Sequence, residues 1–293
     1  MMDSRDQWAQ WVLERRFGGD SRQRDAILGA LTPVRNRVLS NSMLGPGNVV
    51  LDVGAGDGLL SFEALKRVGE SGRVIVSDIS SDLLEHCREF AQASNTIGQF
   101  EFVLAAAEDL WGVDDDSVDA VVMRSVLIYV QRKQDAFREF YRVLKPGGRL
   151  SGFEPINRFG YVDSERVFQG YDVSAIIEIA RKVRAAVFAD IDSQGPDPMM
   201  DFDERDLLNF ADSAGFRDTH VTLEAFIARQ SQRPDWGVVW RTPANPRVPS
   251  LEEAVQRVLT RAEAMEFEQH LRRQMATEEL RARSASAYFW AVK

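Results

Sequence analysis

The sequence predicts an α/β protein built on a doubly wound, mostly parallel sheet. From Asn48 to Phe153, short apolar runs alternate with amphipathic helical patterns, which is the rhythm of β-α-β units with right-handed crossovers. A glycine-rich turn, Gly54 to Gly58, also stands between the first apolar run and a helical pattern. Parallel sheets are buried on both faces, so we expect helices on each side of this sheet.

Residues 1–47 are expected to form a helical segment that caps the sheet. A first helix places Trp8, Trp11, Val12 and Phe17 on one face and ends at the Gly18-Gly19 break, where glycines interrupt helices. The apolar positions of a second helix are Ile27, Leu28, Leu31, Val34 and Val38.

Five strands are predicted in the first part of the remaining 48–293 domain. They cover residues 49–53, 73–77, 100–104, 118–123 and 149–153. The helix after the second strand has an apolar stripe of Leu83, Leu84, Cys87, Phe90 and Ala91. The helix Gln134 to Leu144 is predicted to bury Ala136, Phe137, Phe140, Tyr141 and Leu144, and to end at Lys145-Pro146-Gly147-Gly148, because proline and glycine terminate helices.

Two stretches depart from this alternation and are interpreted as insertions. Residues 156–200 contain a predicted helix, 173–188, and a loop with Gly195, Pro196 and Pro198. Residues 228–283 have nearly balanced charge and several prolines from Pro234 onward. A capping box, Ser250-Leu251-Glu252-Glu253, begins a helix there, whose apolar side is Leu251, Val255, Val258, Ala262 and Met265.

Between and after the insertions the alternation resumes. A helix is predicted at 204–214, followed by the Ala214-Gly215-Phe216 turn and a strand around 220–226. The last predicted strand is 287–292. The insertions are interpreted as a lid or cover over a binding site, and for residues 228–283 a dimer contact is the open alternative.

Composition restricts the function classes. The formal net charge of -9 and the pI of about 5.0 disfavour nucleic acid as a partner, because such a molecule repels polyanions. One cysteine and three histidines exclude the common zinc sites and internal disulfides, so no metal is expected. Without an apolar leader or an apolar run of spanning length, we expect a cytoplasmic protein that does not enter membranes.

The glycine turn and Asp78 together predict a nucleoside site. The turn lets backbone N–H groups approach a ligand, and Asp78 ends the second strand about 20 residues later, where a carboxylate accepts hydrogen bonds from ribose hydroxyls. A dinucleotide-binding fingerprint would need Gly or Ala at position 59, where this chain has Leu59, so that fingerprint is not met. No Gly-Lys-Ser/Thr follows the turn, so the phosphate-loop alternative also fails.

The stretch Val49 to Pro155 resembles the core of class I methyltransferases that use S-adenosylmethionine (SAM), especially the small-molecule, ubiquinone-type branch. Val50 to Gly58 resembles the first motif, with Asp52 orienting the amino group of SAM, and Asp78-Ile79 resembles the second, on ribose and adenine. The cofactor-binding residues implied are Asp52, Gly54, Ala55, Gly56, Gly58, Asp78, Ile79, Leu83, Ala107, Glu108 and Arg124.

Further motifs extend the resemblance. Arg124 and Ser125 match positions near the methionine end, and Lys145-Pro146-Gly147-Gly148 and Gly215-Phe216 match signatures before the fifth and sixth strands. Ala106 replaces the aspartate that contacts adenine in many members. The resemblance implies a Rossmann-like, seven-stranded sheet with an antiparallel last strand, and insertions over the carboxyl edge, where acceptors bind.

The implied reaction is in-line methyl transfer to a small-molecule acceptor, driven by proximity and desolvation. No catalytic residue is assigned. Glu154 and Tyr129 are candidates for acceptor contact, against a helix cap or a loop salt bridge for Glu154 and simple packing for Tyr129. Four tryptophans, Trp8, Trp11, Trp236 and Trp240, are expected to line either an acceptor pocket or the core, and their spacing favours the core. Cys87 is expected to be a buried apolar residue, and His86 and His270 to be solvated.

Three other functions are weighed. A non-catalytic SAM-binding protein would bind without turnover. A nicotinamide-dependent oxidoreductase on a related sheet is disfavoured by Leu59, and cofactor preference distinguishes it. RNA methylation is disfavoured by the net charge and by Arg124-Ser125-Val126-Leu127, which stands where an Asn-Pro-Pro-Tyr motif would follow the fourth strand.

Overall fold

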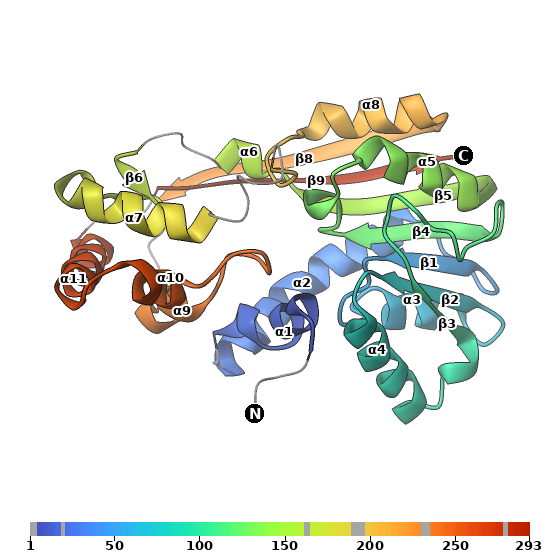
Figure 1. Cartoon of the computed structure of the whole chain (residues 1–293). Helices are drawn as coiled ribbons and strands as arrows, with labels where there is room; N and C mark the ends of the chain where they lie inside the picture. Colours follow the sequence, from blue (N-terminus) through green and yellow to red (C-terminus); the bar gives the residue numbers. More distant parts are fainter. Residues whose placement is uncertain (1–4, 19–20, 161–164, 189–196, 230–234, 278–280) are drawn as a thin grey trace.

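The computed structural model describes residues 5–18, 21–160, 165–188, 197–229, 235–277 and 281–293. Figure 1 shows a body built on the sheet and a separate helical lobe, with two long antiparallel strands, β8 (Arg217–Arg229) and β9 (Arg281–Val292), running between them. Gly19, Gly195, Pro196 and Pro234, which the sequence placed in breaks and loops, lie outside the described residues. Within the described ranges, none of the helices combines the length and apolar character that a membrane crossing requires.

The sheet has seven strands in the order β3-β2-β1-β4-β5-β9-β8. The strands are β1 (Val49–Val53), β2 (Arg73–Asp78), β3 (Phe100–Leu104), β4 (Val118–Arg124), β5 (Leu144–Pro155), β8 (Arg217–Arg229) and β9 (Arg281–Val292). The first five strands pair in parallel, whereas β9 pairs antiparallel with both β5 and β8. The predicted mostly parallel sheet with an antiparallel last strand is therefore confirmed.

Helices cover both faces of the sheet, as the apolar runs predict. On one face, α2 (Ser21–Asn41), α3 (Ser61–Val68) and α4 (Ser81–Ala93) pack against a core that includes Val50 and Val76. On the other, α5 (Lys133–Val143) and α8 (Glu204–Ala214) pack against a core that includes Leu51 and Phe289. Adjacent residues of β1 thus enter opposite cores, because successive side chains of a strand alternate.

The structure corrects three details of the predicted core. Helix α5 ends at Val143, and Leu144 to Gly148 already belong to β5, because the residue before Pro146 favours extended backbone. Tyr141 is only partly buried. Phe90 is 53% exposed: its ring lies edge-on to Phe62, with centroids 4.5 Å apart, outside the core.

The two insertions form one lobe. From the first come the hairpin β6 (Val167–Phe168) and β7 (Tyr171–Asp172), and α7 (Ile177–Phe188), whereas its short helix α6 (Asn157–Gly160) packs on the core of the sheet through Phe159. The second contributes α9 (Trp236–Arg241), α10 (Leu251–Val258) and α11 (Arg261–Thr277). Side chains from both insertions share a single apolar core, separate from those of the sheet.

One long helix was predicted from Ser250, and the structure has two. The Ser250 capping box is present, but α10 ends at Val258, which is 37% exposed, and Met265 is 53% exposed. A second reciprocal cap begins α11, since Thr260 N–H donates to Glu263 (2.9 Å) and Glu263 N–H donates to Thr260 Oγ1 (3.3 Å). This Thr-x-x-Glu pattern is a readable helix start that the sequence reasoning missed.

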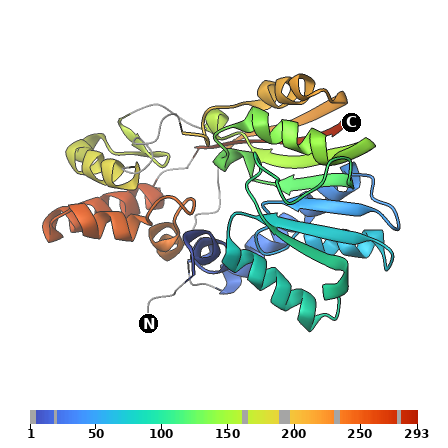
Figure 2. The ribbon, with the colours of Figure 1, turned by 45° about the vertical axis from the view of Figure 1, so that its right-hand side comes forward.

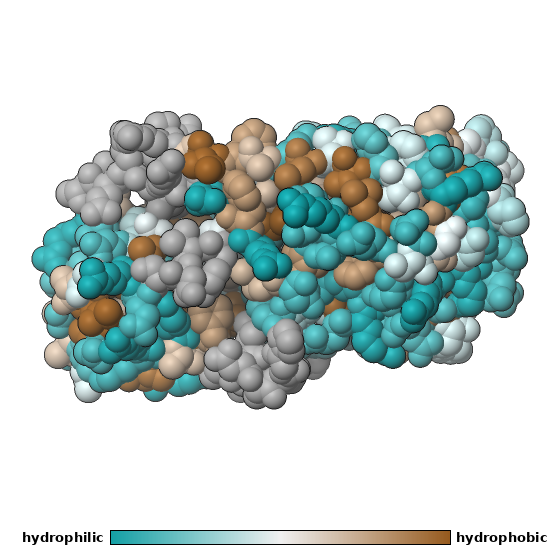
Figure 3. Space-filling view, turned by 90° about the horizontal axis from the view of Figure 1, so that it is seen from above, coloured by the Kyte–Doolittle hydropathy of each residue, from teal (hydrophilic) through white to brown (hydrophobic). Residues whose placement is uncertain are grey.

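Apolar surface remains on the strand β8. Leu223, Phe226 and Ile227 of the edge strand β8 are between 40% and 60% exposed. Viewed from above, apolar side chains gather over the middle of the molecule, between the lobe and the helices of the sheet (Figure 3).

Candidate functional site

A cavity of about 430 Å³ opens at the carboxyl ends of the parallel strands. Following the strand order from β3 to β5, its lining comprises Ala105 to Glu108, Asp78 and Ile79, Asp52 to Asp57, Arg124 to Val126, and Pro155. Because β1 lies between β2 and β4, while β2 and β3 run outward on one side and β4 and β5 on the other, the cavity spans the topological switch point of the sheet. Ten of the eleven residues predicted to bind cofactor line this cavity, and only Gly58 does not.

The three glycines of the turn serve different contacts. A Cβ atom at Gly56 would meet nothing closer than Val12, at 3.8 Å, so this backbone faces open space. A Cβ at Gly54 would come within 2.7 Å of Val126, and one at Gly58 within 2.4 Å of Phe62. Gly54 and Gly58 are therefore required by protein packing, and Gly56 is the glycine that leaves room for a ligand.

Asp78 fixes the glycine turn as well as facing the cavity. Its two carboxylate oxygens accept hydrogen bonds from Gly56 N–H and Ser80 N–H, each at 2.9 Å. Burial raises the pKa of this carboxyl, and the same backbone donors oppose the shift. Each oxygen can accept more than one hydrogen bond, so capacity remains for ligand hydroxyls.

Asp52 lies beneath the turn and is 1% exposed. Its Oδ2 accepts a hydrogen bond from the Ser61 hydroxyl at 2.5 Å. Burial raises the pKa of Asp52 to about 7, against the opposing effect of that hydrogen bond. This carboxylate therefore changes charge near neutral pH, within reach of a cation in the cavity.

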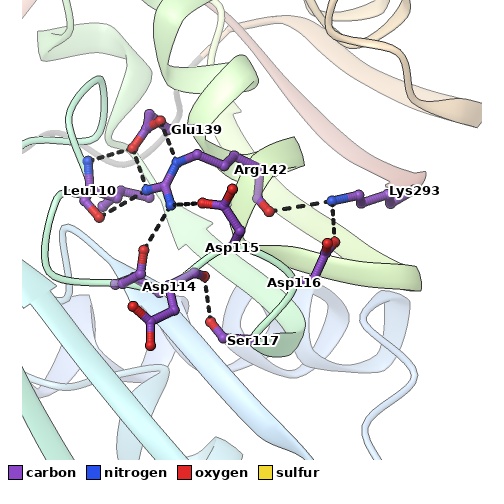
Figure 4. A network of polar contacts seen from close by, with 9 residues as sticks. Leu110, Asp114, Asp115, Asp116, Ser117, Glu139, Arg142 and Lys293 are labelled. Carbon is purple, nitrogen blue, oxygen red and sulfur yellow. Dashed lines mark hydrogen bonds and ion pairs between the residues drawn. The ribbon is translucent and has the colours of Figure 1, made fainter.

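The wall at the β3 end belongs to a loop that α5 holds in place (Figure 4). Arg142 donates to the carbonyl oxygens of Leu110 (3.0 Å) and Val113 (2.8 Å), and Glu139 accepts from Leu110 N–H at 2.8 Å. The Arg142 hydrogen bond also lowers the pKa of Glu139. This clamp anchors the loop just after Ala107 and Glu108.

Glu154 has a structural role, because it holds backbone N–H groups of a neighbouring loop and does not reach the cavity. It is fully buried and does not line the cavity. Its carboxylate accepts from the N–H groups of Val126 (2.8 Å), Leu127 (3.0 Å) and Ile128 (3.3 Å), where a short 3-10 turn, η3 (Leu127–Tyr129), begins. Glu154 therefore orients the loop that brings Tyr129 to the cavity.

The N-terminal segment supplies a wall that the sequence reasoning only partly foresaw. Trp8 and Trp11 of α1 (Gln7–Leu13) line the cavity, and Trp8 packs edge-on against Tyr129 with ring centroids 5.0 Å apart. Arg16 also lines it and was not singled out from the sequence. Figures 1 and 2 both show α1 between the lobe and the sheet.

The remaining candidates lie away from the cavity. Trp236 and Trp240 stack on each other and pack against the lobe core. Cys87 is fully buried, as predicted, and burial raises its thiol pKa. The prediction for His270 was wrong: it is 8% exposed, with Nε2 2.7 Å from the carbonyl oxygen of Asp172, because the lobe core closes around it. Among the described residues, no group of His, Cys, Asp and Glu could hold a metal ion.

Comparison with known proteins identifies the central part of the chain. Residues 51–151 match a family model described as "Methyltransferase domain". Over 138 residues, the chain is 36% identical to the ubiquinone/menaquinone biosynthesis C-methyltransferase UbiE of Marinomonas sp.. The match places a methyltransferase domain at residues 51–151. The alignment covers 47% of this chain and 53% of that relative. The chain therefore spans about half the length of the relative.

Solved structures share the fold of the methyltransferase domain and its surroundings. A protein of Galdieria sulphuraria, provisionally named a sarcosine dimethylglycine methyltransferase, superposes with a TM-score of 0.55 at 14% identity and covers 98% of both chains. The cyclase SpnF superposes with a TM-score of 0.51 at 18% identity, over 94% of this chain and 84% of that one. Identities this low show a common fold alone.

The cavity extends beyond the methyltransferase domain. Beyond residues 51–151, it is lined by Trp8, Trp11, Val12, Arg16, Pro155, Asn157, Met199 and Ala244. Most of these side chains are apolar or aromatic, and they come from the N-terminal segment, the end of β5 and both insertions. One wall of the cavity is thus made by the methyltransferase domain, and another by segments outside it.

Proposed function

We propose that this protein transfers a methyl group from SAM to a small-molecule acceptor. The observation that carries the proposal is the convergence of Asp52, Gly56 and Asp78 on one cavity within the methyltransferase domain. These groups fit the cofactor: Asp78 can accept hydrogen bonds from ribose hydroxyls, Gly56 leaves space for the methionine part, and Asp52 offers a carboxylate to its ammonium group. When bound, SAM supplies an electrophilic methyl group for in-line transfer.

The strand order suggests how the cavity is divided. Ile79, Leu83, Ala107 and Glu108 lie at the β2 and β3 end and are proposed to hold adenine. The acceptor would then lie beyond β4, between Trp8, Tyr129 and the insertions. In this arrangement 1–47 is a cap, 48–293 is the SAM-binding domain, and the insertions, 156–200 and 228–283, form an acceptor cover.

The side chains around the proposed acceptor position favour catalysis by positioning of the acceptor over catalysis by a general base. Burial raises the pKa of Tyr129 above its ordinary value, so this phenol stays protonated at neutral pH and is a poor base. Glu154 is occupied by three backbone N–H groups. The aromatic wall would exclude water and hold the acceptor near the methyl group, which can supply much of the rate of a displacement reaction.

The test is a calorimetric titration with SAM, its demethylated product and NAD in parallel. We expect SAM and the product to bind with dissociation constants of about 1–100 μM, and NAD to bind far more weakly. A preference for NAD, or no binding of SAM and product, would contradict the proposal. Because SpnF shows that this fold also occurs in a protein named a cyclase, transfer must be measured separately, from methyl-labelled SAM to an acceptor library. Binding with no transfer to any acceptor would favour the non-catalytic alternative.

The charge of Asp52 predicts a pH-dependent affinity. With a pKa of about 7, Asp52 is mostly protonated in mildly acidic solution, and attraction of the cofactor's ammonium group requires the ionised form. We expect the SAM affinity to rise about tenfold or more from about pH 5.5 to about pH 7.5, measured by calorimetry. Asp52→Asn should remove this dependence.

The matched ligand for this measurement is 5′-methylthioadenosine, which lacks the amino-acid part of SAM. Its affinity should stay nearly constant over the same pH range. An equal pH dependence for both ligands would assign the titration to another group, with Asp78 as the first alternative, since burial raises its pKa too and it faces the ribose that both ligands contain.

A further inference from the structure

Arg16 is a buried cation that the N-terminal segment places in the cavity. It lies in the short 3-10 turn η1 (Arg15–Phe17) and is 7% exposed. Its Nη2 donates to Asp57 Oδ2 at 2.6 Å, so the glycine turn holds the guanidinium. Its Nε is buried and has no hydrogen-bond partner among the described residues. A buried, unpaired donor that lines a cavity indicates a missing acceptor.

Arg124 is a second guanidinium on the same cavity, at the end of β4. Within the described part of the chain, the hydrogen bond shown for its side chain is one long contact, from Nη1 to Ser125 Oγ at 3.3 Å. Burial and the charge of Arg16 both lower the pKa of Arg124, while Asp57 and Glu154 oppose this shift. Both guanidinium groups line the same cavity, so an anion bound between them would be attracted by both.

A carboxylate suits this pair best. A guanidinium presents a planar fork of donors that matches two carboxylate oxygens. The cavity also contains Asp52, Asp57, Asp78 and Glu108, which would oppose a ligand with the higher charge of a phosphate. The position is beside the glycine turn, next to the proposed place of the methionine part.

We propose that Arg16 and Arg124 together bind a ligand carboxylate inside the cavity, so that the N-terminal segment completes a site begun by the sheet. This inference rests on the proposed function. The carboxylate can come from the methionine part of SAM or from the acceptor. Because Arg16 is held by Asp57 of the glycine turn, the cofactor's own carboxylate is the first source to test.

The decisive ligands are SAM and decarboxylated SAM, which differ by the carboxylate alone. We expect the protein to prefer SAM by about ten- to a hundredfold, the range for hydrogen bonds to charged groups. In Arg16→Gln and in Arg124→Gln, this preference should fall to about threefold or less, with the affinity for decarboxylated SAM little changed. Arg16→Lys should restore part of it.

Arg15→Gln is the matched control. Arg15 is the neighbouring residue, pairs with Glu253 at 2.6 Å and does not line the cavity, so its variant should keep the full preference. Thermal unfolding of each variant would show whether it folds. If SAM does not bind the unaltered protein at all, the proposed function fails, and with it this inference.

A second arm tests the acceptor as the source. Benzoate is titrated into protein saturated with the demethylated product. Benzoate binding that both glutamine variants abolish, together with an unchanged preference for SAM over decarboxylated SAM, would assign the carboxylate to the acceptor. If SAM binds but neither variant alters either measurement, the carboxylate site is overturned.

Discussion

Replacement of Asp78 by asparagine is expected to weaken SAM binding by about a hundredfold, as two charge-assisted hydrogen bonds to the ribose are lost or weakened. The carboxylate also accepts from Gly56 N–H and Ser80 N–H. An asparagine would turn an NH₂ group toward one of these donors, so the glycine turn would lose a contact as well. Calorimetric titration of purified Asp78→Asn measures the effect.

Asp119→Asn is a suitable control for this result. Asp119 lies near the start of β4 and also accepts from a backbone N–H, that of Val49 at 2.7 Å, but it lies beside the opposite end of β1, outside the cavity. The variant Asp119→Asn should leave SAM affinity unchanged. Asp78→Asn should weaken SAM and 5′-methylthioadenosine equally, because both contain ribose. If SAM binding survives within about threefold, Asp78 is not the ribose ligand.

The second large effect is expected in the lobe. Phe267→Ala should lower the free energy of unfolding of the lobe by about 3–5 kcal/mol, the cost of removing a buried phenylalanine. Phe267 of α11 is fully buried and packs edge-on against Phe168 of β6, with ring centroids 5.8 Å apart. This contact joins the two insertions. Hydrogen exchange should show both insertions losing protection together.

Met265→Ala is the comparison on the same helix, because Met265 is 53% exposed. It should change the stability of the lobe little. In Phe267→Ala, amides of β1, β2 and β4 should keep their protection, since the sheet has its own cores. Loss of protection in the second insertion alone would show that the lobe is not one cooperative unit.

The sheet was readable from the sequence because its signals are local. The run Val49 to Val53 and the helix Glu204 to Ala214 have the predicted bounds, and the glycine turn and Asp78 meet at a cavity as their spacing suggested. The carboxyl ends of neighbouring parallel strands lie side by side, so the turn after β1 and the last residue of β2 must come close together. A short stretch of sequence is therefore enough to predict this site. The assignment of individual side chains to the cofactor stays a prediction.

The rest depends on contacts between distant residues. Arg16 and Trp8 reach the cavity because α1 docks beside the sheet: Asp6 accepts from the Ser80 hydroxyl at 2.6 Å, and Asp6 N–H donates to Asp82. Nothing in the spacing of residues 1–47 indicates that docking. The shared core of the two insertions is equally invisible, because an amphipathic helix shows which face is apolar but not what covers it.

The position of β9 also bears on the order of assembly during synthesis. Strand β9 lies between β5 and β8 and pairs with both, although it follows both insertions in the chain. As the polypeptide leaves the ribosome, β1 to β5 can associate early, whereas β8 has no neighbour in the sheet until β9 emerges. An unpaired β8, with Leu223, Phe226 and Ile227 exposed, is the kind of edge on which nascent chains associate. The interval before β9 appears is therefore when we expect this protein to depend most on chaperones.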